Sequence, residues 1–464
     1  MTGFADGPLV AWVGDDFTGS AATMEVLEFA GLPAVLFLMP PTRDQLARFP
    51  GVRGIGIATT ARSHTPDWMD RELPPILAAL AATGAPVVHY KVCSTLDSAP
   101  HVGSIGRAID LGRATIGAGW VPCLIAAPVM RRYQAFGHLF AGTPEGVFRL
   151  DRHPVMATHP VTPMGEADVA RHLSQQTACR FGAITIEDLD TDPAAALARQ
   201  LAQGAQVVTI DAMTQAHMAR GGALIWPDSA ADQRFADQRF VVGSQGVEYA
   251  LTAHWRDAGL IPAQDRDASA GAVDRILAVS GSVSPITAAQ ITHAEAHGFA
   301  IIALDVGAVM RGDATAEAQA VQAAMDALAR GLDPLICSAR GPDDPAISAM
   351  HAARDAAGLS DEDANARIGA ALGRCLKRLL KDTGIRRAVI SGGDTSGHAA
   401  RQLDIFAVTA LAPTIPGAAL LAAHSDDPAL AGLQLALKGG QMGSPDYFGW
   451  IKRGGGTATK GQDT

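Results

Sequence analysis

The stretch LVAWVGDDFTGSAATMEVLEFAGLP, residues 9–33, contains a predicted strand followed by a predicted helix, a pair of elements that recurs along the chain. Its first run, LVAWV, is typical of a strand buried on both faces, and the segment after the loop has the apolar spacing of a helix. Over the next hundred residues, four further apolar runs alternate with helix-like segments. These runs are AVLFL, GIGIA, PVVHY and CLIAA. This strand–helix–strand alternation predicts an α/β fold with a mostly parallel sheet flanked by helices.

A second set of these elements follows a stretch at 256–275 that is rich in Asp, Ala and Gly. Strands are predicted there by the runs ILAVSG, AIIALDV, DPLICSA and RAVISGG, and a long helix is expected from about 360 to 383. We therefore predict two domains, 1–257 and 274–464, each with a mostly parallel sheet flanked by helices, and a linker near 258–273.

The composition argues against several classes of protein. Lys and Arg number 37 against 47 Asp and Glu, a net charge of −10 without any basic block, which argues against nucleic-acid binding. No apolar stretch is long enough to cross a membrane, and the first residues lack the basic segment of a secretory signal. The 5 Cys are far apart with no C-x-x-C pair. We expect a cytoplasmic protein with reduced thiols and no zinc site.

Two acids, Asp15 and Asp16, follow directly after the first predicted strand, where like charges repel and packing does not need them. Arg62 in ATTARSH and Lys91 in HYKVCSTLDS also come just after predicted strands. Ligands of open α/β sheets bind outside the carboxyl ends of the strands, so we expect these four side chains in one crevice. Arg is suited to bidentate carboxylate recognition, and Lys supplies a point charge.

Such a crevice suits a small polyhydroxylated acid, because Ser94 and Thr95 add hydroxyls for hydrogen bonding. Simpler roles stay open at this stage. Asp16 or Ser20 can cap the helix that follows, and Arg62 can belong to an ordinary surface ion pair.

Three loops of small residues recur in the second domain, SGSVSP (280–285), SGGDTSG (391–397) and LKGGQMG (437–443). Small residues let backbone N–H groups approach a ligand, and a helix that starts there adds partial positive charge. Ser284 and Pro285 suit the cap and the first position of such a helix. A tight turn explains one loop, but three predict a phosphate cradle and hence a phosphorylated nucleotide. None matches G-x-x-x-x-G-K-[ST] or a clean G-x-G-x-x-G.

These segments, in order along the whole chain, resemble the four-carbon acid sugar kinase family. VGDDFTGS resembles its N-terminal DDFTG signature, and YKVCSTLDS stands where the family has a Tyr-Lys-Lys-x-Asp-Ser-Thr-like segment. SGSVSPITAAQI, DPLICSA, SGGDTSG and LKGGQMGSPDYF resemble its nucleotide-binding domain. The resemblance implies an ATP-dependent kinase whose N-terminal domain binds a short sugar acid and whose C-terminal domain binds ATP. It also implies an active site in the interdomain cleft, with domain closure that excludes water.

Carried over position by position, the resemblance implies roles for particular residues. The substrate-binding candidates are Asp15, Arg62, Lys91, Ser94 and Thr95. The ATP-site candidates are Ser280, Ser282, Gly392, Gly393, Asp394, Thr395, Gly439 and Gly440. One of the paired aspartates orients the nucleophilic hydroxyl and accepts its proton, and we favour Asp16. Mg²⁺ is expected to bridge the ATP phosphates, with Asp394 nearby and no protein ligand assigned.

The chain departs from the common family pattern at Cys93, Asp97 and Asp394, and the first two changes should alter the choice of substrate. The run HYKVCSTLDSAPHVGSIGRAID looks closer to a subgroup acting on 3-oxo-isoapionate-type branched acids than to threonate or erythronate kinases. A non-catalytic sugar-acid or nucleotide sensor stays an alternative, and it would tolerate loss of Asp16. An NAD oxidoreductase is disfavoured by the missing glycine fingerprint. A homodimer is compatible with the sequence.

Overall fold

The predicted strand GIGIA has glycine at alternate positions because an indole ring lies against it. A Cβ on Gly56 would lie 2.2 Å from the ring of Trp12, and a Cβ on Gly54 would lie 3.2 Å from the same ring. Trp12 is fully buried, so these glycines let the largest side chain of one strand lie against the next. The computed structural model describes residues 4–456 except 118, 144, 160, 228–237, 264–267, 416 and the side chains of 394–396.

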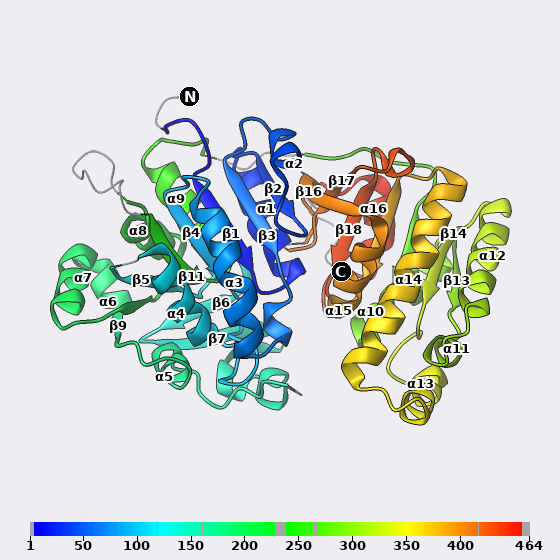
Figure 1. The fold of residues 1–464 in the computed structure, drawn as a ribbon, viewed down its shortest axis with the longest axis horizontal. Helices are drawn as coiled ribbons and strands as arrows, with labels where there is room; N and C mark the ends of the chain where they lie inside the picture. Colours follow the sequence, from blue (N-terminus) through cyan, green and yellow to red (C-terminus); the bar gives the residue numbers. More distant parts are fainter. Residues whose placement is uncertain are drawn as a thin grey trace. The chain divides into compact units, whose positions relative to one another are not determined.

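The chain forms two compact units, Met1–Arg266 and Asp267–Thr464 (Figure 1). The sheet of the first unit has the order β2-β3-β1-β4-β11-β5-β10-β9, and its paired neighbours are parallel. Its strands are β1 (Val10–Gly14), β2 (Ala34–Phe37), β3 (Gly54–Ala58), β4 (Val87–Lys91), β5 (Val121–Leu124), β9 (Phe181–Ile184), β10 (Val207–Ile210) and β11 (Arg239–Gly243).

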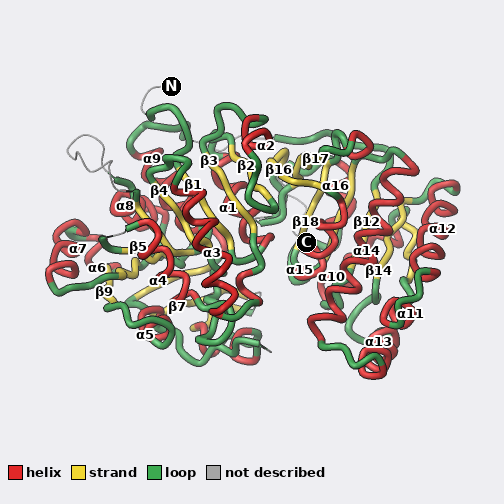
Figure 2. Tube along the Cα trace, in the orientation of Figure 1, coloured by secondary structure: helices red, strands yellow, loops and turns green. Residues whose placement is uncertain are grey.

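Helices flank this sheet, with α1 packed against α9 and α3 packed against α4 (Figure 2). The helices of the first unit are α1 (Phe17–Phe29), α2 (Arg43–Ala47), α3 (Pro66–Ala81), α4 (Ile105–Ile116), α5 (Val169–Ser174), α6 (Ile186–Asp190), α7 (Pro193–Ala202), α8 (Gln215–Ile225) and α9 (Gly246–Asp257). A separate antiparallel sheet of β6 (Arg132–Ala135), β7 (His138–Thr143) and β8 (Gly146–Arg149) was not predicted.

The sheet of the second unit has the order β13-β14-β12-β15-β18-β17-β16. Its pairs are parallel from β13 to β18, whereas β17 runs antiparallel to both β18 and β16. The strands are β12 (Leu277–Ser280), β13 (Phe299–Ala303), β14 (Asp333–Cys337), β15 (Arg387–Ser391), β16 (Ile405–Ala412), β17 (Leu420–Ser425) and β18 (Gln434–Lys438).

The helices of the second unit include the long one predicted from about 360 to 383. They are α10 (Pro285–Ala296), α11 (Val306–Met310), α12 (Thr315–Ala329), α13 (Pro345–Ala356), α14 (Asp361–Thr383), α15 (Gly393–Ala400) and α16 (Tyr447–Arg453). The predicted α/β class with mostly parallel sheets is therefore confirmed. No helix in the described part of the chain has the length and apolar character needed to span a bilayer.

Candidate functional site

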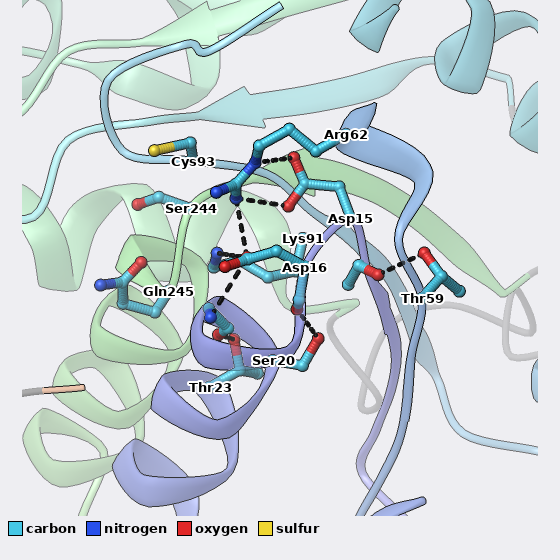
Figure 3. Close-up of polar contacts among 12 residues, drawn as sticks. Asp15, Asp16, Ser20, Thr23, Thr59, Arg62, Lys91, Cys93, Ser244 and Gln245 are labelled. Carbon is cyan, nitrogen blue, oxygen red and sulfur yellow. Dashed lines mark hydrogen bonds and ion pairs between the residues drawn. The ribbon is translucent and has the colours of Figure 1, made fainter. Parts of the chain in front are cut away.

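The register of the first sheet brings the predicted acid-site residues together. Gly14, the last residue of β1, pairs with the last residue of β3 on one side and with Lys91 of β4 on the other. Asp15 follows β1 directly, and Arg62 lies in a short 3-10 helix just after β3. The side chains of Asp15, Asp16, Arg62 and Lys91 consequently meet at one edge of the sheet (Figure 3).

Arg62 binds both acids. Its Nε and Nη2 atoms donate to the two oxygens of Asp15 at 3.1 and 2.7 Å, and Nη2 also donates to Oδ1 of Asp16 at 2.7 Å. Burial raises the pKa of Asp15 above its ordinary value, although the Arg62 charge opposes this effect. Burial would lower the pKa of Arg62, but the two carboxylates outweigh it and hold that pKa well above its usual range. The guanidinium of Arg62 therefore stays charged and holds the two carboxylates in place.

Asp16 caps α1 and also faces the two cations. Its Oδ1 atom accepts the Gly19 N–H at 3.1 Å, so the cap interpretation left open by the sequence is correct. The same oxygen lies 4.0 Å from Nζ of Lys91, and the side chain is 27% exposed. Burial would raise the pKa of Asp16, but the charges of Arg62 and Lys91 outweigh it and lower that pKa. Asp16 is thus an ionised carboxylate with access to solvent.

Lys91 lies over the first turn of α1, with a side chain that is 2% exposed. A Cβ on Gly19 would lie 2.1 Å from Nζ of Lys91 and 2.4 Å from Oδ1 of Asp16. A side chain at position 19 would therefore have to displace the ammonium group of Lys91 and the carboxylate of Asp16.

We expect Gly19→Ala to raise KM for the organic substrate about tenfold, which corresponds to roughly 1.4 kcal/mol of lost binding. The methyl group must displace the ammonium of Lys91, while Ala favours a helix over Gly by about 1 kcal/mol. The thermal midpoint should consequently stay within a few degrees of the wild type. Gly307→Ala is a matched control, because Gly307 lies in the first turn of α11, which Asp305 caps, and its Cβ would have 3.3 Å of clearance. An unchanged KM in Gly19→Ala would contradict the placement of Lys91.

Ser94 and Thr95 lie in the turn after β4 and are partly buried. The hydroxyl of Thr95 is 3.0 Å from Sγ of Cys93, and the Leu96 N–H closes the turn on the Cys93 carbonyl at 3.1 Å. Asp97 points elsewhere, since its carboxylate accepts the Thr162 hydroxyl. Figure 3 shows Cys93 close to the guanidinium of Arg62.

The turn after β11 adds two side chains that the sequence analysis did not select. β11 pairs with β4, so Gly243 lies beside Lys91 and the next residues, Ser244 and Gln245, reach the same edge (Figure 3). The Ser244 hydroxyl donates to the Ile125 carbonyl at 2.7 Å, which fixes the turn. The available signal was the sequence GSQG between a strand and a helix, the same kind of turn that we selected in the second half of the chain.

In the second unit, the three small-residue loops follow three adjacent parallel strands. Ser280 of β12 pairs with Ser391 of β15, which pairs with Lys438 of β18. The hydroxyls of Ser280 and Ser391 are fully buried, and neither bonds another group in the described part of the chain. Buried hydroxyls without partners are uncommon in proteins and suit the oxygen atoms of a ligand.

The first and third loops are in direct contact. The Ser284 hydroxyl caps α10, as predicted, and donates to the Gly440 carbonyl. A Cβ on Gly440 would lie 2.3 Å from the hydroxyl oxygen of Ser282, so a side chain there would displace that hydroxyl. Gly439, at the start of the same loop, accepts a hydrogen bond from Nζ of Lys438 at 3.2 Å.

The second loop contains the remaining candidates. Gly392 has φ of 123°, a conformation that favours glycine, and its N–H donates to the Lys438 carbonyl at 2.9 Å. Gly393 is the first residue of α15. The side chains of Asp394 and Thr395 lie outside the described residues.

Lys438 was missed by the sequence analysis, although its position resembles that of Lys91 at the end of β4. It is fully buried, and burial lowers its pKa to about 8. Its ammonium donates to the Thr287 hydroxyl at 3.3 Å as well as to Gly439, and it lies 5.9 Å from the centre of the Tyr447 ring.

Comparison with known proteins covers both units. A model of a sugar-binding N-terminal domain matches residues 10–251, and a model of a nucleotide-binding C-terminal domain matches residues 277–448. A curated relative from Paraburkholderia graminis, named 3-oxo-isoapionate kinase, is 46% identical over 456 residues, which cover 98% of this chain and 96% of the relative. A 3-oxo-tetronate kinase from Burkholderia multivorans is 29% identical over 456 residues, with 97% of each chain covered.

Among solved structures, a Salmonella typhimurium LT2 protein described as a candidate tRNA synthase has a TM-score of 0.76 and 26% identity to this chain. The match covers 96% of this chain and 98% of that one. Both units of the fold thus have a counterpart in an experimental structure.

Proposed function

The chain belongs to the four-carbon acid sugar kinase family, and from this premise we propose that it phosphorylates a hydroxyl of a 3-oxo sugar acid, with 3-oxo-isoapionate as the first candidate. It is a phosphotransferase with ATP as the phosphate donor. The identity of 46% to a 3-oxo-isoapionate kinase supports the branched acid over the four-carbon acids of the relatives near 29%.

The cluster of Asp15, Asp16, Arg62 and Lys91 carries the assignment of the acid site. Within the described residues, Nη1 of Arg62 has no protein partner, and Nζ of Lys91 has only Asp16 at 4.0 Å. Both cations therefore keep donors for a carboxylate or keto oxygen of the substrate. Ser94 and Thr95 are proposed to bind its hydroxyls.

The proposed reaction is an in-line phosphoryl transfer. The substrate oxygen forms a bond to the γ-phosphorus of ATP, the bond from that phosphorus to the bridging oxygen breaks, and ADP leaves. The hydroxyl proton passes to the carboxylate of Asp16, which is ionised and open to solvent. Arg62 and Lys91 fix the acid so that this hydroxyl, rather than water, is the nucleophile.

The nucleotide is assigned to the loops after β12, β15 and β18. The unpartnered hydroxyls of Ser280 and Ser391 and the tight contact between Gly440 and Ser282 fit a bound phosphate chain. Ser282, Gly392, Gly393 and Gly439 line the same loops, and Asp394 and Thr395 stay in the proposal on the family resemblance. Mg²⁺ would neutralise phosphate charge there, held by the phosphates and water.

The matched models, the cysteines and an exposed apolar surface support three further assignments. We assign residues 1–257 to acid binding and 274–464 to nucleotide binding, which follows the two matched models. Five free cysteines support a cytoplasmic location. Exposed Val129, Phe136 and Val147, in and beside the sheet of β6–β8, support a homodimer, which light scattering would test.

An ATP-consumption screen tests the function. The panel is 3-oxo-isoapionate, the four-carbon 3-oxo acids, and threonate and erythronate, with the product identified by ³¹P NMR. We expect the highest kcat/KM with the branched 3-oxo acid. Turnover with a four-carbon acid alone would overturn the substrate assignment, and no turnover with any acid would overturn the kinase.

A further inference from the structure

One face of α10 binds a series of carbonyl groups in the loop after β18. Ser284, Thr287 and Gln290 are spaced three residues apart and so share this face. The Ser284 hydroxyl donates to the Gly440 carbonyl, and the Thr287 hydroxyl lies 3.0 Å from the same oxygen. Nε2 of Gln290 donates to the carbonyls of Met442 and Ser444, at 2.9 and 3.0 Å.

Lys438 extends this series by one position, because its ammonium donates to the carbonyl of Gly439. Four carbonyls of the segment 439–444 are thus bound by side chains that are themselves 8% exposed or less. These contacts exceed what a turn requires, because the carbonyl groups of an exposed loop can bond water instead of buried side chains.

The consequence for the amide groups follows from peptide geometry. In a trans peptide the C=O of one residue and the N–H of the next point in opposite directions, and no cis peptide is present in the described chain. The N–H groups of Gly440, Gln441 and Gly443 are therefore turned away from the side chains that bind the carbonyls. None of the three bonds another group within the described residues. Pro445, next along, has no N–H to offer.

We propose that Gln290 and Thr287 are positioning residues that orient the loop 439–444 so that the amides of Gly440, Gln441 and Gly443 bind the phosphate chain of the nucleotide. Oriented amides form an anion site whose positive ends are fixed before the ligand arrives. The ammonium group of Lys438 donates to the Gly439 carbonyl and polarises the peptide group that contains the Gly440 N–H. The ligand's identity as a nucleotide rests on the proposed function, but the anion site itself does not.

Calorimetric titration of Gln290→Leu and Thr287→Val tests the proposal, with ADP, inorganic tripolyphosphate and adenosine as probes. We expect Gln290→Leu to raise Kd for ADP and tripolyphosphate about tenfold and Thr287→Val about threefold, with adenosine binding and KM for the sugar acid unchanged. Thr292→Val is the control, because Thr292 lies on the exposed face of α10 and its hydroxyl donates to the Ala288 carbonyl at 3.0 Å, one turn back in the same helix. Wild-type Kd for both phosphate probes in Gln290→Leu would overturn the proposal, as would an equal loss of adenosine binding.

Hydrogen exchange of the wild-type protein gives a measurement that does not depend on how the variants fold. The amides of Gly440, Gln441 and Gly443 should become protected on addition of tripolyphosphate and not of adenosine. Absence of protection would overturn the assignment of these amides. If the acid screen shows no turnover while tripolyphosphate still protects the loop, the kinase proposal fails and the anion site stands.

Discussion

Asp16→Asn is expected to lower kcat by about 10²- to 10⁴-fold, the usual contribution of a positioned general base. The amide cannot accept the hydroxyl proton, whereas its size matches the carboxylate and Asn is as good a helix cap as Asp. The Gly19 N–H therefore keeps its partner, and α1 should keep its start. ADP affinity and the thermal midpoint should change little. Steady-state kinetics combined with calorimetry therefore separates the effect of the Asp16 charge on catalysis from effects on nucleotide binding and folding.

Asp192→Asn is a matched control, because Asp192 caps α7 by the same contact, to the Ala195 N–H at 3.0 Å. This variant should have wild-type kcat. Turnover of Asp16→Asn within threefold of the wild type would assign the base elsewhere, with Asp15 the next residue to test.

The pH profile provides a second check on the same residue. The pKa of Asp16 is lowered from its ordinary value of 3.8, so the base stays ionised as the pH falls through the neutral and mildly acidic range. The rate should then fall only below about pH 4, where the carboxylate takes up a proton. Burial raises the pKa of the neighbouring Asp15, so an acid limb near pH 6 in kcat/KM would contradict Asp16 as the base if it persisted in Asp15→Asn.

Arg62→Met is expected to reduce the free energy of unfolding by about 3 kcal/mol and the thermal midpoint by about 6–12 °C. The substitution leaves Asp15, whose side chain is 3% exposed, without its bidentate partner and next to a second carboxylate. Asp15→Asn in the same chain should recover part of the loss, since it removes the uncompensated charge. Thermal unfolding of the two single variants and the double variant completes the cycle.

Arg107→Met serves as the exposed counterpart. Arg107 and Asp70 form an ion pair with side chains 38% and 39% exposed, so its loss should cost less than about 1 kcal/mol. Equal effects of the two substitutions would show that the Arg62 network does not stabilise the fold. Substrate turnover by Arg62→Met should fall as well, because the acid loses its guanidinium partner.

The elements that were predicted well are those that a short stretch of sequence identifies, through a continuous apolar run or a helix cap. GIGIA matches β3, and the run after Ser360 matches α14, because continuous apolar strands and a capped helix are local properties. The sheet of β6–β8 was missed because its strands are half exposed and carry no strict alternation. The antiparallel strand β17 was missed because its sequence, LLAAHS, is rich in Leu and Ala, residues that favour a helix at least as much as a strand.

The same distinction applies to the candidate site. Asp15, Asp16, Arg62 and Lys91 could be grouped from the sequence because each follows a strand that was itself recognisable. Ser244 and Gln245 could not, because their place beside Lys91 depends on β11 entering the sheet between β4 and β5. The roles of Lys438 and Gln290 depend on contacts between α10 and a loop about 150 residues away in the sequence. No local sequence pattern predicts contacts over such a separation.

The four charged groups at the end of β1 sum to zero, with two carboxylates against a guanidinium and an ammonium. A substrate anion therefore approaches a locally neutral surface on a chain with a net charge of −10, and long-range attraction cannot speed its capture. The association rate constant should accordingly depend only weakly on ionic strength. Discrimination among acids is then made at contact, where the substrate carboxylate meets the donors of Arg62 and Lys91 that the two aspartates leave available. The enzyme is expected to select its acid through how slowly it leaves rather than how quickly it arrives.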